Sequence, residues 1–364
     1  MNYKRLKGFT KRSTKSFMKT ILVFLIAVAI AIAPATALAS PPSIEAKAYI
    51  VVDADTGEIL AERNSEEVLV PASMTKLMTV YLTLENINNH KISWSDEVVI
   101  SEQANRISRH SSLSSYPLPL GDKYSVQDLF YGAVLNSSNA STVSLAEHIG
   151  GDESAFVGMM NEKARNFGLT DTRFVNPSGL NNSDLFGNHP QGAGRNDDTK
   201  LSARSMALIA YRLLNDYPEV VGYTSMTQAT IREGLSDERV IRTTNRLLPT
   251  REMALDGALG LKTGYIFNAG FCFAGYTSRP SGRLISVVMG ATTSNERFRG
   301  SARLLEYGYT ILEERAASAD TAAASTGTTA ASAASAGGST GAGTSTEAGA
   351  TNAGEGASTG TGTG

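Results

Sequence analysis

Short apolar runs and apolar residues at helical spacing predict the strands and helices of this chain. Apolar runs at 48–53 and 58–62 flank Asp55-Thr56-Gly57, and this arrangement predicts a β-hairpin. Two more strands are predicted at 270–277 and 284–290, with Pro280-Ser281-Gly282 as the turn between them. Apolar spacing near 3.6 predicts helices at 126–135, 140–149, 153–167 and 203–214, and an amphipathic helix at 295–314. We therefore expect an α+β fold, in which strands from both ends form one antiparallel sheet around a helical insertion.

Composition separates this globular region from a C-terminal tail. Residues 43–315 have the composition of one large domain or of two closely packed subdomains. From 316 to 364 the chain is almost entirely Ala, Gly, Ser and Thr, with no aromatic residue. Such a segment buries too little apolar surface to offset its ordering entropy, so we predict that it is disordered. The tail is open to interpretation as a spacer through a cell wall, as a glycosylated segment, or as a segment with no specific role.

The N-terminus has the three parts of a secretory signal peptide. Seven Lys and Arg residues without any acidic residue precede a continuous apolar run at 21–33. Ala37-Leu38-Ala39 follows as a small-x-small cleavage site, which predicts a signal peptide at 1–39 and an exported protein, in the cell wall or periplasm. An uncleaved N-terminal anchor is the alternative, so the sequence leaves membrane attachment open.

Charge and ligand-type residues exclude several classes of function. Removing seven positive charges from a net charge of −2 leaves −9, which argues against sequence-independent nucleic-acid binding. The sole cysteine, Cys272, lies in an apolar strand-like run and is expected to be buried rather than reactive. With one cysteine and four scattered histidines, no metal site is expected, and His148 is interpreted as structural.

The segment Ser73-Met74-Thr75-Lys76 is the strongest candidate for chemistry. Residues three apart share one face of a helix, so Lys76 can reach the Ser73 hydroxyl. A lysine that is buried beside another cation has a lowered pKa and can act as the base that activates a serine. Alone, the pattern is weak: it also occurs at Ser16–Lys19, and it fits an ordinary helix start with a solvated lysine.

Two further short motifs change that assessment. Ser137-Ser138-Asn139 lies between two predicted helices and alone could be a simple N-cap. Lys262-Thr263-Gly264 reads as a strand whose glycine permits close approach of a substrate, and alone could be an edge strand. The order Ser-x-x-Lys, Ser-x-Asn, Lys-Thr-Gly is the shared signature of penicillin-binding proteins and serine β-lactamases.

The surrounding sequence resembles the D-alanyl-D-alanine carboxypeptidases among the low-molecular-mass penicillin-binding proteins. The resemblance runs from about Ala48 to Tyr307. It is carried by the segments 71–79, 144–148, 174–180, 244–248 and 260–265. It implies the antiparallel sheet and helical subdomain of the β-lactamase and penicillin-binding transpeptidase fold. It also implies a serine peptidase that acts on peptidoglycan stem peptides, is inhibited by β-lactams such as penicillin, and needs no metal or organic cofactor.

The resemblance also implies a role for each motif residue. Ser73 would attack the carbonyl between two terminal D-alanines, Lys76 would be the base, and Ser137 would relay a proton to the leaving amine. Substrate would be bound by Asn139, Lys262, Thr263, Gly264 and Tyr265. Lys262 would also lower the pKa of Lys76, and the backbone N–H groups of Ser73 and Tyr265 would form the oxyanion hole.

Three departures from the family pattern and three alternatives accompany this interpretation. Ser138 stands where glycine is common and Tyr265 where histidine is common, and the Gly- and Asn-rich stretch 181–200 predicts a different loop near the site. A D,D-endopeptidase that cuts cross-links fits the same motifs. A β-lactamase fits less well, because no Glu-x-x-Leu-Asn element follows the second motif. A non-catalytic cell-wall-binding protein would not need every motif residue.

Overall fold

One five-stranded antiparallel sheet organises the computed structural model, which describes residues 40–334. Its strands lie in the order β2-β1-β9-β8-β7. Their bounds are β1 Ala48–Asp53, β2 Ile59–Arg63, β7 Ala258–Ile266, β8 Gly270–Arg279 and β9 Gly282–Ala291. Strands from the two ends of the globular region are neighbours, since β1 pairs with β9 over its whole length. The predicted α+β class and the hairpins at 48–62 and 270–290 are confirmed.

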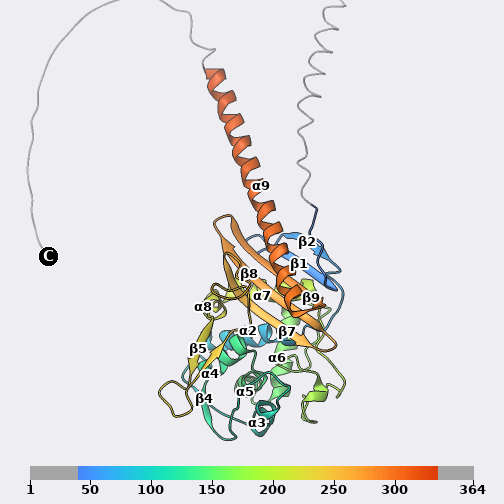
Figure 1. Cartoon of the computed structure of the whole chain (residues 1–364), viewed down its shortest axis with the longest axis vertical. Coiled ribbons are helices and arrows are strands. Elements are labelled where there is room, and N and C mark those ends of the chain that lie inside the picture. The colour runs from blue at the N-terminus through green and yellow to red at the C-terminus, as the bar shows by residue number, and fades with distance from the viewer. Residues whose placement is uncertain (1–39, 335–364) are drawn as a thin grey trace, which may run out of the picture. The chain divides into compact units, whose positions relative to one another are not determined.

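The two faces of the sheet belong to different layers, because alternate residues of a strand point to opposite sides. Tyr49, Val51 and Val288 pack against the first part of α9 (Ser294–Ala334), which lies beside β1 and β9 in Figure 1. Ile50 and Val287 point the other way, into the main core beneath the helical insertion. The sheet is therefore covered on both faces.

The insertion between β2 and β7 supplies nearly all the remaining helices. Its longer helices are α2 Lys76–Asn88, α3 Glu102–Arg109, α5 Asn139–Gly150, α6 Glu153–Asn166 and α7 Ala203–Asp216. Short elements are η1 Ala72–Thr75, α4 Val126–Tyr131, η3 Asn182–Asp184 and α8 Val220–Thr224. Two small two-stranded antiparallel sheets complete it: β3 Glu97–Val99 with β4 Lys123–Ser125, and β5 Gln228–Ile231 with β6 Arg239–Arg242. In Figure 1, α3, α4 and α5 gather at the lower end of the view.

The predicted helix at 126–135 is interrupted. It is α-helical only to Tyr131, and Gly132–Asn136 form a π-helical turn, η2, that ends at Ser137 in the left-handed conformation (φ 61°). Single π turns inside helices occur frequently at functional sites. This turn sets the start of α5 and brings the second motif to the surface of a cavity.

The last helix is longer than predicted. It begins at Ser294, as expected, but continues to Ala334 instead of ending near 314. Residues 316–334, predicted to belong to a disordered tail, are thus helical, because alanine has the highest helix propensity and extends a helix that has already formed. The remaining tail, 335–364, and the predicted signal peptide, 1–39, lie outside the described residues. Within residues 40–334, no helix is long and apolar enough to cross a membrane.

Candidate active site

The turn that carries Ser73 is held tightly between the sheet and a loop. Ser73 lies in η1, directly before α2, and follows Ala72, whose φ of 51° is strained for a residue with a side chain. Strand β7 packs against this turn: a Cβ atom on Gly264 would lie 2.6 Å from the Pro71 carbonyl oxygen. A Cβ atom on Gly179, in the turn at 176–180, would come even closer to the Ala72 carbonyl oxygen. The position of Ser73 is therefore set by contacts that only glycine allows.

Lys76 is completely buried and its ammonium nitrogen has three partners. Nζ donates to Ser73 Oγ at 3.0 Å, to Asn139 Oδ1 at 2.7 Å and to the Ser178 carbonyl oxygen at 2.7 Å. If Lys76 loses a proton, Asn139 Oδ1 and the Ser178 carbonyl oxygen can still accept hydrogen bonds from its two remaining N–H groups. The nitrogen lone pair is then left facing the Ser73 hydroxyl. The geometry thus suits a general base for that serine.

The electrostatic surroundings of Lys76 also favour a role as a general base. Its pKa lies well below the ordinary value for lysine, first because full burial penalises the charged form and second because Lys262 repels it. Burial beside another cation was the condition expected from the sequence for a lowered pKa, and the family resemblance implied that Lys262 is this cation. The neutral amine is the form that can accept the serine proton.

A short turn at Asn176–Leu180 fixes the third partner of Lys76. The side-chain oxygen of Asn176 accepts hydrogen bonds from the backbone N–H groups of Ser178 and Gly179, at 3.1 and 2.7 Å, and its amide donates to Leu180 O. Thr79 Oγ1 of α2 donates to Pro177 O at 2.7 Å, which attaches the turn to the helix of Lys76. The sequence analysis used this segment only as part of a resemblance and missed that Ser178 orients Lys76.

The three residues of the second motif have different positions and contacts. Ser137, in the left-handed conformation, is 6% exposed and lines the cavity together with Ser73. Ser138 is the N-cap of α5, because its Oγ accepts the backbone N–H of Ser141 at 3.1 Å. Asn139 points toward Lys76. The N-cap interpretation is thus correct for the central serine only.

The third motif, on β7, brings a hydroxyl to the cavity and a buried lysine beside it. Lys262 is buried, and its pKa is lowered to about 7, first by burial and then by repulsion from Arg297. Thr263 Oγ1 lies 2.7 Å from the Thr244 hydroxyl. Arg297, at the start of α9, donates to Gly264 O at 3.0 Å and also lines the cavity. This end of the cavity is therefore suited to an anion such as a carboxylate.

Arg297 and Thr244 were not identified as site residues from the sequence. Arg297 comes from a helix predicted only as amphipathic, and nothing in its local sequence distinguishes it from neighbouring arginines. Thr244 lies in a segment quoted for the family resemblance, which was the available signal.

All the predicted site side chains converge on one cavity of about 410 Å³ or lie directly beneath it. Ser73, Ser137, Asn139, Thr263, Gly264 and Tyr265 line it, and Lys76 and Lys262 are buried next to these residues. The loop at 181–200 lines the opposite wall through Asn181 and Asp184. Asn268 Nδ2, in the β7–β8 turn, donates to Asp198 Oδ2 of that loop at 2.7 Å. The loop that the sequence singled out therefore does border the site.

Cys272 and His148, which were interpreted as structural, both lie outside the cavity formed by the three motifs. Cys272 is buried on β8, and burial raises the pKa of its thiol to about 11. His148 lies at the far end of α5, outside the cavity that holds Ser73. Within residues 40–334, no group of three or more His, Cys, Asp or Glu side chains is arranged to hold a metal ion.

Fold and site together define an α+β enzyme in which a buried lysine is poised to activate a serine. Residues 35–293 match the sequence family Peptidase_S11, described as D-alanyl-D-alanine carboxypeptidase. The chain belongs to this family, which confirms the family and the fold class predicted from its motifs.

Individual relatives agree with that membership. The chain is 33% identical to D-alanyl-D-alanine carboxypeptidase DacC of Escherichia coli, covering 80% of this chain and 68% of the relative. It is 34% identical to DacF of Bacillus subtilis, covering 74% of this chain and 63% of the relative. It thus spans about two thirds of the length of these relatives. Both are named carboxypeptidases, so the endopeptidase alternative is the weaker one.

Solved structures with the same fold include penicillin-binding proteins. The chain superimposes on PBP3 of Streptococcus pneumoniae with a TM-score of 0.70 and 34% identity, covering 73% of this chain and 74% of that one. It is also similar to Penicillin-Binding Protein D2 of Listeria monocytogenes in its ampicillin-bound form. That match has a TM-score of 0.62 and 29% identity, and covers 74% of this chain and 98% of that one.

Proposed function

We propose that this protein is a serine-type D-Ala-D-Ala carboxypeptidase that removes the last D-alanine from peptidoglycan stem peptides through an acyl-enzyme on Ser73. The observation that carries the proposal is the 3.0 Å contact between Lys76 Nζ and Ser73 Oγ, in which a fully buried lysine faces a half-buried serine. Family membership supports the choice of substrate.

In the acylation step, Lys76 takes the Ser73 proton as Oγ bonds to the carbonyl carbon of the penultimate D-alanine. The peptide C–N bond then breaks, and the leaving amine receives a proton that passes from Lys76 through Ser137. The backbone N–H groups of Ser73 and Tyr265 hold the oxygen that becomes negative, and losing one such donor typically costs about 10²–10³ in rate. Water next attacks the ester and releases the shortened peptide.

The cationic end of the cavity provides substrate recognition. The substrate ends in a carboxylate, and Lys262, Thr263 and Arg297 offer two positive groups and a hydroxyl for it. Binding a carboxylate there favours the charged form of Lys262. Gly264 keeps β7 close enough to Ser73 for the carboxylate and the scissile carbonyl to be held together. Asn139 is proposed to hold a substrate amide as well as Lys76.

β-Lactams are proposed to acylate the same serine. Their ring amide presents a carbonyl to Ser73 and a carboxylate to the Lys262 end, which are the two features of the peptide substrate. The ampicillin-bound relative of the same fold supports this proposal.

We further propose that the chain is exported, with 1–39 as its signal peptide and 43–315 as its catalytic domain. N-terminal sequencing of the secreted protein tests the cleavage at Ala39.

Mass spectrometry of the purified chain tests the function. Incubation with benzylpenicillin should give an adduct on Ser73, and a pentapeptide ending in D-Ala-D-Ala should lose one D-alanine. Ser73→Ala should do neither. An adduct without release of D-alanine favours the endopeptidase, and rapid penicillin hydrolysis without an adduct favours a β-lactamase. Neither adduct nor turnover favours a non-catalytic binding protein.

A further inference from the structure

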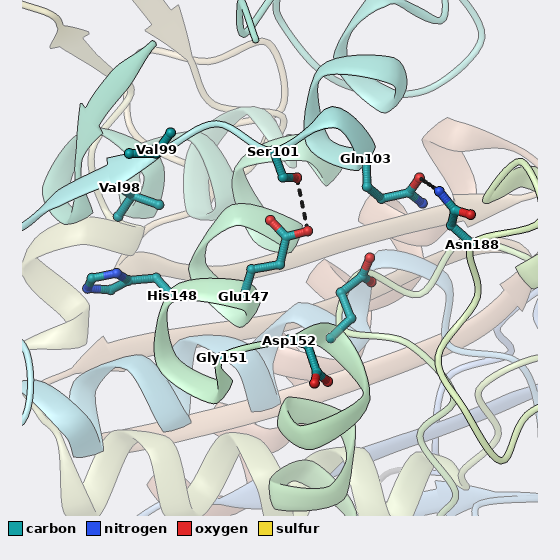
Figure 2. A pocket seen from close by; sticks show the side chains of 10 residues that line it. Val98, Val99, Ser101, Gln103, Glu147, His148, Gly151, Asp152 and Asn188 are labelled. Atoms are coloured by element: carbon teal, nitrogen blue, oxygen red, sulfur yellow. Dashed lines mark hydrogen bonds between the residues drawn. The ribbon is translucent and has the colours of Figure 1, made fainter. Parts of the chain in front are cut away.

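A second cavity, of about 480 Å³, lies at the opposite end of α5 from Asn139. It is formed by β3, the start of α3, the end of α5 and the start of α6, and Asn188 from the loop at 181–200 closes one side. Figure 2 shows Glu147, Asp152, Gln103 and Asn188 around this space. None of the residues that carry the proposed peptidase chemistry lines it.

Three carboxylates line the cavity, and one of them is buried without a partner. Glu147 accepts a hydrogen bond from Ser101 Oγ at 2.9 Å, and Asp152 caps α6 by accepting the backbone N–H of Ala155. Glu153 is only 9% exposed, and its Oε2 has neither a hydrogen-bond partner nor contact with solvent. A buried polar atom in this state is unfavourable unless a ligand or solvent satisfies it.

The charges around Glu153 also disfavour its ionised form. No lysine or arginine lines the cavity. The negative end of the α5 dipole lies at Gly151, and it opposes the positive end of α6, whose first residue is Glu153. Burial, then Glu147, then Asp152 raise the pKa of Glu153 to about 8. The other titratable side chain, His148, has its Nε2 3.7 Å from Asp96 Oδ2, too far for a hydrogen bond. A positive ligand would reverse each of these unfavourable interactions.

The remaining walls indicate what kind of cation fits. Val98 and Val99 form an apolar side, shown at the left of Figure 2, and Val99 is 57% exposed. The amides at the other side are already paired, since Asn188 Nδ2 donates to Gln103 Oε1 at 3.1 Å. An aliphatic chain suits the valines and an ammonium head suits the carboxylates. A bare metal ion fits less well, because no three carboxylates or histidines of residues 40–334 are arranged to hold one.

We propose that this cavity binds a primary alkylammonium group, with its N–H donors on Glu153 and Glu147 and its methylene groups on Val98 and Val99. The ligand is either a free aliphatic amine or a lysine-type side chain of a peptide, since both present the same head and stem. This site is independent of the function proposed for Ser73.

Calorimetric titration of the full-length protein tests the proposal. Pentylamine hydrochloride serves as the free-amine probe, Nα-acetyl-lysine amide as the peptide-borne probe, and pentanol as the uncharged control. We expect saturable one-to-one binding of at least one amine and none of pentanol, and the tighter amine identifies the source. Affinity should rise from pH 6 to pH 9, because the carboxyl of Glu153 must lose its proton to pair with the ammonium.

Substitutions locate the binding. Glu153→Gln should weaken amine binding by at least about tenfold, equivalent to about 1.4 kcal/mol. Glu66→Gln removes an exposed carboxylate that pairs with Arg204 elsewhere and should leave binding unchanged. Glu147→Gln removes the charge of the second proposed acceptor and should also weaken amine binding, which provides a second test should Glu153→Gln fold poorly. The proposal is overturned if neither amine saturates, if pentanol binds equally, if calcium binds in place of the amines, or if both cavity variants bind like the unmodified protein.

Discussion

Gly264 and Pro71 touch across the active site: a Cβ atom added to Gly264 would lie 2.6 Å from the Pro71 carbonyl oxygen. Strand β7 therefore rests directly on the turn that carries Ser73. The relationship matters because we propose that these two elements bind the substrate carboxylate and the scissile carbonyl. The distance between β7 and the turn that carries Ser73 depends on the absence of a side chain at Gly264.

Gly264→Ala should therefore damage both activity and stability. The new methyl group meets backbone rather than a flexible side chain, so β7 must move away from Ser73, at a cost of about 1–3 kcal/mol. We expect a lower melting temperature and slower acylation by a fluorescent penicillin. Gly158→Ala in α6 is the matched control, since its added methyl meets nothing within 4 Å and should stabilise the helix by about 0.5–1 kcal/mol. Equal behaviour of the two variants would contradict this account.

Lys76→Met should leave a folded protein that acylates very slowly. The substitution removes the base that faces Ser73, and general-base groups typically contribute about 10²–10⁴ in rate. Stopped-flow measurement of β-lactam acylation gives the rate, and circular dichroism checks the fold. Arg303→Met, at an exposed ion pair on α9, is the control and should acylate normally. Acylation of the Lys76 variant within about threefold of the unmodified rate would assign the base elsewhere.

The pH profile of kcat/KM should be bell-shaped. The rising limb follows loss of the Lys76 proton, because the lowered pKa makes the neutral base available below the ordinary lysine range. The falling limb follows Lys262, whose pKa is about 7 and whose positive charge is proposed to hold the substrate carboxylate. A steady-state pH series checks this. In Lys262→Met we expect a higher KM and no such falling limb; a retained limb would point to another group.

Stability should fall with increasing pH because of Glu153. Its folded-state pKa of about 8 lies above the unfolded value, so between about pH 4.5 and 8 the folded state holds more protons than the unfolded state. Ionisation of Glu153 then opposes folding as the pH rises. Glu153→Gln should flatten the decline in melting temperature over this range, whereas Glu66→Gln should not. An unchanged slope in Glu153→Gln would show that the carboxyl is better solvated than its burial indicates.

The sequence predicted the fold class and the three site motifs because their signals are local. The hairpin at 48–62 has a turn sequence between two apolar runs, and the spacing of Ser73 and Lys76 is set within one turn of helix. The end of the helix predicted at 126–135 was harder to predict, because the π turn and the left-handed conformation of Ser137 depend on packing against other segments. The alanine-rich extension of α9 was missed because low complexity was interpreted as disorder.

By itself, the sequence determined the strands of the main sheet at both ends of the globular region, most of the longer helices, and the Ser-x-x-Lys, Ser-x-Asn and Lys-Thr-Gly residues. Only the tertiary structure decided how these parts meet. Ser178 O orients Lys76 across 102 residues of chain, Arg297 reaches the cavity from the last helix, and Glu153 is buried beside two other carboxylates. The physical reason is that burial and the contacts of a charge depend on segments far apart in the chain, and these quantities set its pKa.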